Sequence, residues 1–369
     1  MLAGPVTRGS ASLYIHDGVT IVQSCGPAGF SSGETQGSLL VDAGSDFLNM
    51  LRQPLVKVLL RPLWLRWRSA LPRLEISKEI MAELEGYASG TGVPLWMLML
   101  GNFLFDLYQK GPAQCTTFVL HGADGMVIGR NTDINPWLAR LLARWLKPLV
   151  IQVAGPDIRS YVHVSIPGFV GVMNGVNDAG ISVHSHLSVD VKVAADCRGL
   201  PAALLSRRIL ENAATLLEVD QIVRDARVQA PINLLVTSAS QQDGRIYELL
   251  AGEFSAQGLG VMDNACTTHF RSASMALCHS TQVAGSRHRL EVLEGLLRSD
   301  PTATAVRAIE ILRSRVGGNR YSGSSYAICN PGTFQSFVMD LPGGSLHIAT
   351  GRRAPVPIFS DYVEVPFQP

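Results

Sequence analysis

The sequence predicts a layered α+β fold, and three observations favour it. Short apolar runs separated by Gly, Asp and Asn fill much of the chain after residue 115, which is typical of strands. Helical patterns come in pairs rather than singly between strands. Apolar residues make up 47% of the 369 residues and charged residues only 17%, as in a tightly folded protein. Paired helices beside a strand-rich body indicate layers rather than alternating βαβ units.

The chain before residue 114 is predicted to be mainly helical, after a strand-like start. Residues 10–45 are strand-like and rich in Gly and Ser, with a hairpin expected around Asp17-Gly18. Residues 51–73 contain six basic residues and no acidic one, interleaved with Leu, Val and two tryptophans. The prolines at 54, 62 and 72 are expected to divide this segment into short pieces.

Two better helices follow. Ser77 is a suitable N-cap for the first, with acidic residues in its early turns and Gly86 or Gly90 near its end. The second begins after Gly92, and its apolar density predicts a buried helix.

Beyond Cys115 the pattern changes to strands. Two strands are expected around the turn at 122–125, and helices are expected only at about 200–226 and 285–316, the last one opened by Asp300-Pro301. The chain ends in the strand-like segments SSYAICNP, TFQSFVMDL and SLHIATG. No internal repeat or linker is evident, so one structural domain is expected.

Charge and cysteine content exclude several classes of protein. The net charge of +1 provides no global field for nucleic acid. The N-terminus lacks the pattern of a secretory signal, and no run of about eighteen apolar residues predicts a spanning helix. The six cysteines form no CxxC pair, so neither a zinc framework nor a compact disulfide scaffold is expected. We expect a cytoplasmic protein without cofactor or metal. Export directed by a leader that is missing from this sequence is the alternative.

Cys115 is the first candidate for chemistry. It stands where the helical region ends and a strand begins, after the turn-prone residues 110–114. A cysteine at the end of a strand can be reached by a substrate, whereas most lone cysteines only fill space.

Arg130 and Asp133 end the next strand, so a hairpin returns them to the neighbourhood of Cys115. A cation lowers the pKa of a nearby thiol, and a carboxylate can hold an ammonium group. If the chain is cut before Cys115, the new α-amino group, with a pKa of roughly 7.7–8.0, is a base on the same residue as its nucleophile. The alternative for Arg130 and Asp133 is an ordinary pair at a surface turn.

Several motifs around these candidates resemble a known family. They are ELEGYASGTGVPLWMLMLGNFLFDLYQKGPAQCTTFV, GRNTD, PGFVGVMNGVNDAGISVH, TTHF and RLEVLEGLL. Their order and spacing, from about residue 80 to residue 350, resemble the group of acid ceramidase, N-acylethanolamine acid amidase and acyl-CoA:6-aminopenicillanic acid acyltransferase. This group is peptidase C45-like and lies in the choloylglycine hydrolase superfamily of N-terminal-nucleophile (Ntn) hydrolases.

The resemblance implies a four-layer αββα sandwich and a chain that cuts itself between Gln114 and Cys115. Residues 1–114 would form an α segment, released or retained, and residues 115–369 a β segment with the catalytic core. The freed Cys115 would be the nucleophile that cleaves an N-acyl amide, with a fatty-acyl group expected, through a thioester. Acyl transfer to an amine is the alternative, because the same thioester serves both reactions.

The resemblance also assigns roles to charged residues. Arg130 matches the arginine beside the nucleophile, and Asp133 matches the aspartate that binds its α-amino group. Arg289 best matches a later arginine of the site, with Arg287 as a near alternative.

This sequence departs from the family at two positions. Thr268 stands in TTHF where the family has an asparagine of the oxyanion hole, and His186 lies near a position where relatives often have asparagine. A hydroxyl of Thr268 or the amide of Asn264 are candidate replacement donors. Asn177 matches the family as well, as a site residue or as a turn former. These departures keep open a third interpretation, a catalytically decayed relative that binds lipid or a partner.

Other sites carry weaker signals. His184 and His186 share one face of a strand, as metal ligands sometimes do, but the spacing suggests no third ligand. The basic apolar segments 51–73 and 136–149 resemble elements that lie on lipid surfaces. Buried helices with solvated arginines, or contacts with a second subunit of a homo-oligomer, are the alternatives.

Overall fold

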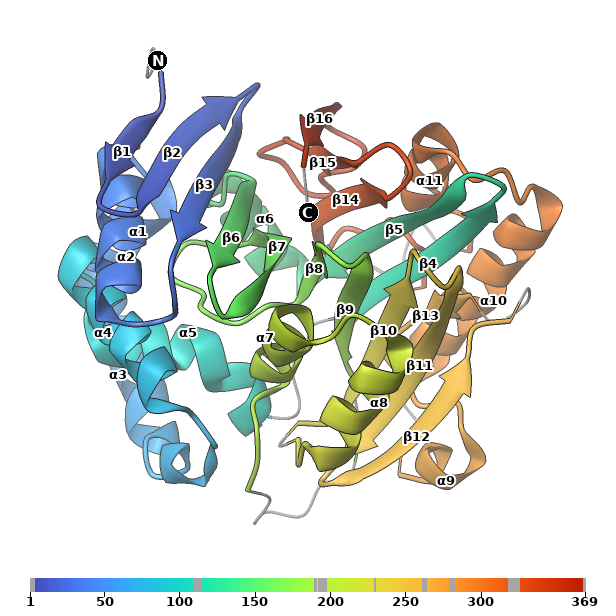
Figure 1. The fold of residues 1–369 in the computed structure, drawn as a ribbon, viewed down its shortest axis with the longest axis horizontal. Coiled ribbons are helices and arrows are strands. Elements are labelled where there is room, and N and C mark those ends of the chain that lie inside the picture. The colour runs from blue at the N-terminus through green and yellow to red at the C-terminus, as the bar shows by residue number, and fades with distance from the viewer. Residues whose placement is uncertain are drawn as a thin grey trace.

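The computed structural model describes residues 4–108, 114–188, 191, 198–228, 230–260, 264–278, 283–317 and 326–367. Its described strands form two sheets that lie face to face between helices (Figure 1). None of the described helices is both long enough and apolar enough to cross a bilayer.

The larger sheet has ten described strands, and neighbouring strands are antiparallel except for β3 and β6, which are parallel. In their order across the sheet they are β1 (Val6–Arg8), β2 (Ala11–His16), β3 (Val19–Cys25), β6 (Leu149–Gly155), β7 (Ile158–Ser165), β8 (Asn174–Asn177), β9 (Ile181–Leu187), β10 (Ile232–Ser238), β11 (Asp243–Leu250) and β12 (Glu253–Gly258). The segment before residue 114 therefore contributes three strands to a sheet that is completed by the rest of the chain.

The smaller sheet has six described strands, all antiparallel. In order they are β13 (Ala265–Cys266), β4 (Gln114–Gly122), β5 (Gly125–Asp133), β14 (Thr333–Asp340), β15 (Ser345–Ala349) and β16 (Tyr362–Pro366). The expected hairpin at residues 122–125 joins β4 to β5 and sets the register that brings Gln114 opposite Asp133.

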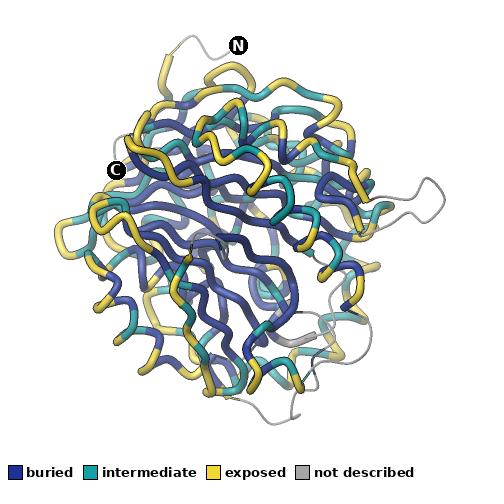
Figure 2. Tube along the Cα trace, turned by 90° about the vertical axis from the view of Figure 1, so that its right-hand side faces the viewer, coloured by how far each residue is buried: buried dark blue, intermediate teal, exposed yellow. Residues whose placement is uncertain are grey.

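Successive residues along a strand belong alternately to two hydrophobic cores, one between the sheets and one beneath the helices. Ile21, Val150, Val119 and Phe337 belong to one cluster between the sheets. Their neighbours Val22 and Ile151 instead contact the helices on the outer face of the larger sheet. Figure 2 shows this buried backbone running through the middle of the molecule, with exposed residues concentrated at its periphery.

Helices cover both outer faces. The larger sheet is covered by α1 (Phe30–Asp42), α4 (Lys78–Thr91), α5 (Leu95–Tyr108), α7 (Ala202–Asn212) and α8 (Leu216–Asp225), and the smaller sheet by α10 (Ala284–Ser299) and α11 (Ala305–Leu312). The other described helices are α2 (Asp46–Arg52), α3 (Pro54–Trp67), the 3₁₀ turn η1 (Leu71–Arg73), α6 (Pro136–Trp145) and α9 (Ala273–Ala276). The α+β class and the four-layer αββα arrangement are confirmed.

Some local predictions were wrong. Residues 30–42 form the helix α1 rather than a strand, because their glycines allow close packing against α4. Pro62 lies inside α3 without ending it. The carbonyl group that it leaves without a helical partner belongs to Val58, which is 68% exposed, so water can bind it.

The ends of two helices also differ from the predictions. Gly92, with a φ of 68°, caps α4, whereas Gly86 and Gly90 lie inside it. Helix α11 begins at Ala305 with Thr304 as its N-cap, rather than at Asp300-Pro301. The described part of the segment SSYAICNP is a turn, and β16 is a strand that the sequence did not predict.

Candidate active site

Cys115 is the second residue of β4, and it is only 4% exposed. The chain is continuous through Gln114 and Cys115, so the structure represents the uncut protein. Because side chains alternate along a strand, Cys115 and Thr117 share the face of Val119, which is turned to the other sheet. Gln114 lies on the opposite face, so the end of β4 presents groups to both sides.

Arg130 of β5 connects Cys115 to the larger sheet. Its Nη2 atom donates to Cys115 Sγ at 3.3 Å and to the backbone oxygen of Ser185 at 2.7 Å, while Nη1 donates to Thr117 Oγ1 at 3.3 Å. The guanidinium group is 1% exposed, so its charge acts on the thiol without screening by bulk water.

The pKa of the Cys115 thiol is nevertheless raised above its ordinary value in the uncut chain. Burial raises this pKa most, and Arg130 and Arg289 lower it by less. The neighbouring cation thus lowers the thiol pKa, as expected, but desolvation outweighs its effect in the uncut protein.

Asp133 lies opposite Gln114 across the β4–β5 pair, next to the peptide bond that would be cut. Its carboxylate accepts hydrogen bonds from Asn330 Nδ2 at 2.8 Å and Thr333 Oγ1 at 2.6 Å. Burial raises its pKa to about 6, although Arg289 and the two hydrogen bonds oppose this shift. A buried carboxyl group is thus held on the strand opposite the bond between Gln114 and Cys115.

Arg289, on α10, contacts the beginning of β4 from the outer face of the smaller sheet. It is fully buried, and its Nη1 atom donates to Gln114 Oε1 at 2.6 Å, while Nη2 donates to Thr268 Oγ1 at 3.3 Å. Arg287 is exposed. The geometry therefore favours Arg289 over Arg287 as the later arginine of the site.

Ser286 lies one turn before Arg289 and was missed in the sequence. Its Oγ atom lies 3.0 Å from the backbone nitrogen of Thr268, 3.2 Å from Thr268 Oγ1, 2.9 Å from His269 Nδ1 and 3.0 Å from Thr267 Oγ1. One hydroxyl thus fixes the segment that carries Thr268. Helical spacing of three residues from Arg289 is the signal that could have pointed to it.

His186, on β9, lies against the backbone of Cys115 and is fully buried. Burial and then the charge of Arg130 lower its pKa well below the usual value, although the Cys115 backbone raises it, so the imidazole is neutral. The ring of His184 stacks on Phe337 instead, with 6.4 Å between centroids. No group of three or more His, Cys, Asp or Glu side chains that could hold a metal ion occurs in the described ranges.

Two other candidates lie away from Cys115. Asn264 Nδ2 donates to the carbonyl oxygen of Val119, four residues further along β4, or roughly 13 Å at the rise of a strand. Asn177 donates to the carbonyl groups of Leu210 and Ala213 at the end of α7, and its Oδ1 atom accepts two backbone N–H groups of its own turn. Neither asparagine therefore offers a donor to Cys115, and Asn177 has the role of a turn former.

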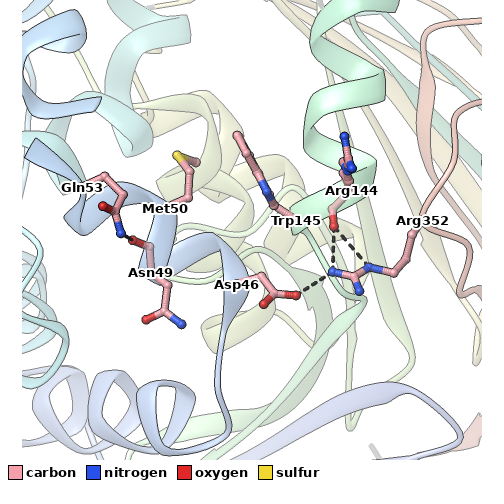
Figure 3. Close-up of a pocket in the computed structure, with 7 residues that line it drawn as sticks. All are labelled: Asp46, Asn49, Met50, Gln53, Arg144, Trp145 and Arg352. Atoms are coloured by element: carbon pink, nitrogen blue, oxygen red, sulfur yellow. Dashed lines mark hydrogen bonds and ion pairs between the residues drawn. The ribbon is translucent and has the colours of Figure 1, made fainter. Parts of the chain in front are cut away.

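A cavity of about 740 Å³ opens at the far end of α6 from Asp133 (Figure 3). It is lined by Asp46, Asn49, Met50, Gln53, Arg144, Trp145 and Arg352. Arg352 Nη2 donates to Asp46 Oδ2 at 2.6 Å and to the carbonyl oxygen of Arg144 at 2.8 Å, as the dashed lines show. Helix α6 is about 15 Å long at 1.5 Å per residue, which separates this cavity from the Cys115 site.

Comparison with solved structures finds several similar chains. A mutant of the conjugated bile acid hydrolase from Clostridium perfringens is 10% identical, with a TM-score of 0.46. The match covers 68% of this chain and 92% of the chain of that mutant. Penicillin V acylase from Agrobacterium tumefaciens is 17% identical with a TM-score of 0.41, covering 64% and 83%. The Caenorhabditis elegans ortholog of N-acylethanolamine-hydrolyzing acid amidase is 14% identical with a TM-score of 0.45, covering 68% and 100%. No curated protein matches the sequence significantly.

The sequence also matches a family model over more than half of its length. The model describes acyl-coenzyme A:6-aminopenicillanic acid acyl-transferase, and it matches residues 120–329. This range contains Arg130, Asp133, Thr268 and Arg289, and it begins shortly after Cys115. The resemblance of the motifs is confirmed: the chain belongs to the acyl-coenzyme A:6-aminopenicillanic acid acyl-transferase family.

Proposed function

We propose that this protein is a self-processing cysteine amidase that cleaves a linear N-acyl amide through a thioester on Cys115. The observation that carries the proposal is the environment of the bond between Gln114 and Cys115. Arg130 contacts the thiol, Arg289 holds the side chain before the bond, and Asp133 lies opposite Gln114 on the neighbouring strand.

Maturation begins with attack of Cys115 Sγ on the carbonyl carbon of Gln114. The bond from that carbon to the Cys115 nitrogen breaks as the carbon–sulfur bond forms, and the nitrogen takes a proton. Water then hydrolyses the thioester, which leaves a carboxylate on Gln114 and a free thiol and amino group on Cys115. Asp133 holds the new ammonium group, and the segments 1–114 and 115–369 stay associated.

Turnover uses the same atoms. The α-amino group of Cys115 takes the thiol proton, the thiolate attacks the amide carbonyl, and the amine product leaves with a proton. In the uncut chain Thr268 Oγ1 accepts from Arg289 and donates to Ser286 Oγ, so it would have to turn its hydrogen from Ser286 to the oxyanion, and the neutral His186 can supply a second N–H. Water resolves the acyl-enzyme.

Acyl transfer is the second candidate, because the matched family model describes an acyl-transferase. An amine would then resolve the thioester in place of water. We expect a fatty-acyl amide as the donor in either case, and hydrolysis as the main outcome.

Intact-mass measurement of the purified protein and of Cys115→Ala tests the proposal. Wild type should give the segments 1–114 and 115–369, and Cys115→Ala only the whole chain, because alanine has no thiol for the acyl shift. Cut protein incubated with a panel of N-acyl amides, with and without an added amine, then separates hydrolysis from transfer by the products.

A lasting single chain without turnover would instead support the decayed relative that binds lipid or a partner. A cut at 114/115 that persists in Cys115→Ala would show a foreign protease and would contradict self-processing.

A further inference from the structure

Asn233, a buried residue of β10, connects the larger sheet to the segment that carries Thr268. Its side-chain Nδ2 atom donates to the backbone oxygen of Thr267 at 2.8 Å and to that of His269 at 2.9 Å. These two carbonyl groups belong to the residues on either side of Thr268. One amide nitrogen therefore fixes the backbone both before and after the candidate oxyanion donor.

The oxygen of the same amide group is bonded as well. Ser188, which follows β9 directly, donates from Oγ to Asn233 Oδ1 at 3.4 Å, and both residues are buried. An asparagine side chain has two N–H donors on one atom and its acceptor on the other. It can therefore serve two carbonyl groups and one hydroxyl at the same time only in a single orientation, so the Asn233 side chain is itself held in place.

The strand register places His186 beside the same residue. His186 of β9 lies directly opposite Asn233 in the antiparallel pair of β9 and β10, which are neighbours in Figure 1. Residues paired in this way share one face of the sheet, with Cβ atoms about 4.5–5.5 Å apart. That face is turned to the smaller sheet, because Leu235, two residues along, belongs to the core between the sheets. Asn233 thus holds the segment of one proposed oxyanion donor, Thr268, and is the strand neighbour of the other.

Ser286 holds the same segment from another layer of the fold. Its Oγ atom, on helix α10 over the smaller sheet, accepts from the backbone N–H of Thr268 at 3.0 Å. The carbonyl group of Thr267, the N–H group of Thr268 and the carbonyl group of His269 are therefore all bonded to buried side chains. Partners from two layers of the fold thus set where the backbone of Thr268 lies.

We propose that Asn233 is a positioning residue, which holds the Thr268 hydroxyl at a fixed place relative to His186. This role rests on the proposed function, because it assumes that these two side chains bind the oxyanion. Asn233 acts through the backbone on both sides of Thr268 rather than by touching the substrate. A threonine hydroxyl is one bond nearer to the backbone than an asparagine amide, so its reach depends more on where the backbone lies. A displacement of about 1 Å in a site can lower a rate by about a hundredfold.

Steady-state kinetics on an N-acyl amide tests this role, with intact mass to show that each variant is cut. Asn233→Ala should lower kcat by about tenfold to a hundredfold with a small change in KM, because the oxyanion donors act mainly in the transition state. Asn233→Gln retains an amide and should recover part of the rate. Ser188→Ala, which removes one long hydrogen bond and disturbs folding less, should lower kcat by only about twofold to fivefold.

A double variant shows whether Asn233 acts on the same segment as Ser286. Asn233→Ala combined with Ser286→Ala should lose less than the product of the two single losses, because a segment already released by one change has less left to lose by the other. Losses that multiply fully would mean that Asn233 does not act through the position of Thr268.

Asn102→Ala is the matched control. Asn102 of α5 is buried, and its Nδ2 atom also donates to two backbone oxygens, those of Leu98 and Gly168, at 2.9 Å each, on the outer side of the larger sheet. This variant should lower the thermal unfolding temperature about as much as Asn233→Ala but leave kcat unchanged. An unchanged kcat in Asn233→Ala, or equal losses of kcat in both variants, would overturn the role of Asn233 while the proposed function stands. A wild type that neither cuts itself nor turns over an amide would remove the proposed function, and this role with it.

Discussion

The single oxygen atom of the Ser286 side chain makes several polar contacts in the site. Its removal should therefore show whether Ser286 positions Thr268 for catalysis or only stabilises the fold. Ser286→Ala deletes the acceptor of the buried backbone N–H of Thr268 and the partner of its hydroxyl. We expect kcat on an N-acyl amide to fall by about tenfold to a hundredfold, somewhat less than the loss of an oxyanion donor itself, with a small change in KM. Steady-state kinetics on the cut enzyme measures both.

Ser286→Thr retains the hydroxyl and should recover much of the rate, and Ser299→Ala, at the exposed end of the same helix, should behave as wild type. If Ser286→Ala lowers thermal stability but leaves kcat unchanged, Ser286 only supports the structure.

Asp133 should make the stability of the uncut protein depend on pH. Its pKa in the folded state, about 6, is above its ordinary value of 3.8, so the folded protein binds the proton more tightly than the unfolded chain. The resulting stabilisation is present below pH 3.8 and is lost as the pH rises through 6. It is on the order of 3 kcal/mol for a shift of about two pKa units.

Urea unfolding of Cys115→Ala, with and without Asp133→Asn, measures this contribution between pH 4 and pH 7. The free energy of unfolding with Asp133, relative to that with asparagine, should fall across this interval. A difference that is independent of pH would show that Asp133 does not titrate there.

At the scale of elements, the pair α1 and α4 depends on glycines. A Cβ atom at Gly86 would collide with the backbone oxygen of Phe30, and one at Gly33 with that of Glu83. Gly86→Ala should therefore force the helices apart and destabilise the fold by about 1–3 kcal/mol, or more if the backbone cannot move. Thermal unfolding provides the measurement.

Gly101→Ala is the matched control, because Gly101 is exposed in the middle of α5 and a Cβ atom there meets nothing within 4 Å. It should stabilise the protein by about 0.5–1 kcal/mol, the usual advantage of alanine in a helix. Equal effects of the two variants would mean that the helices are not in close contact.

These glycines also show where local patterns stop being informative. The hairpin at 122–125 and the paired helices after residue 200 could be predicted because turn residues and periodicity are local. Helix α1 could not, because its glycines are explained only by a neighbour about fifty residues away.

In the site, too, local contacts could be predicted from the sequence and contacts between distant segments could not. The hairpin brings Arg130 and Asp133 to Cys115 by strand length alone, whereas Arg289 came from the resemblance. Asn330, which binds Asp133 from 197 residues away, has no signal in the sequence around it.

At the scale of the whole molecule, the contacts across the cut predict that both segments remain together. Strand β3 pairs with β6 over six residues, from Thr20 to Cys25. Arg207 of α7 binds Glu83 of α4 at 2.8 Å with both side chains buried. Cut protein should therefore elute from gel filtration as one species of the mass of the whole chain, and separate into two only in denaturant. Two species under native conditions would contradict this.

The parallel pairing of β3 with β6 has a consequence for recovery from unfolding. The connection between these strands runs through residues 26–148 and thus contains the bond that would be cut. In the uncut chain the two strands are tethered and find each other at a fixed effective concentration. After the cut their encounter is bimolecular, so refolding should slow as the protein is diluted, whereas Cys115→Ala should refold at a rate independent of dilution. The uncut chain would then fold readily, whereas the mature protein, once unfolded, would recover its native state slowly at low concentration.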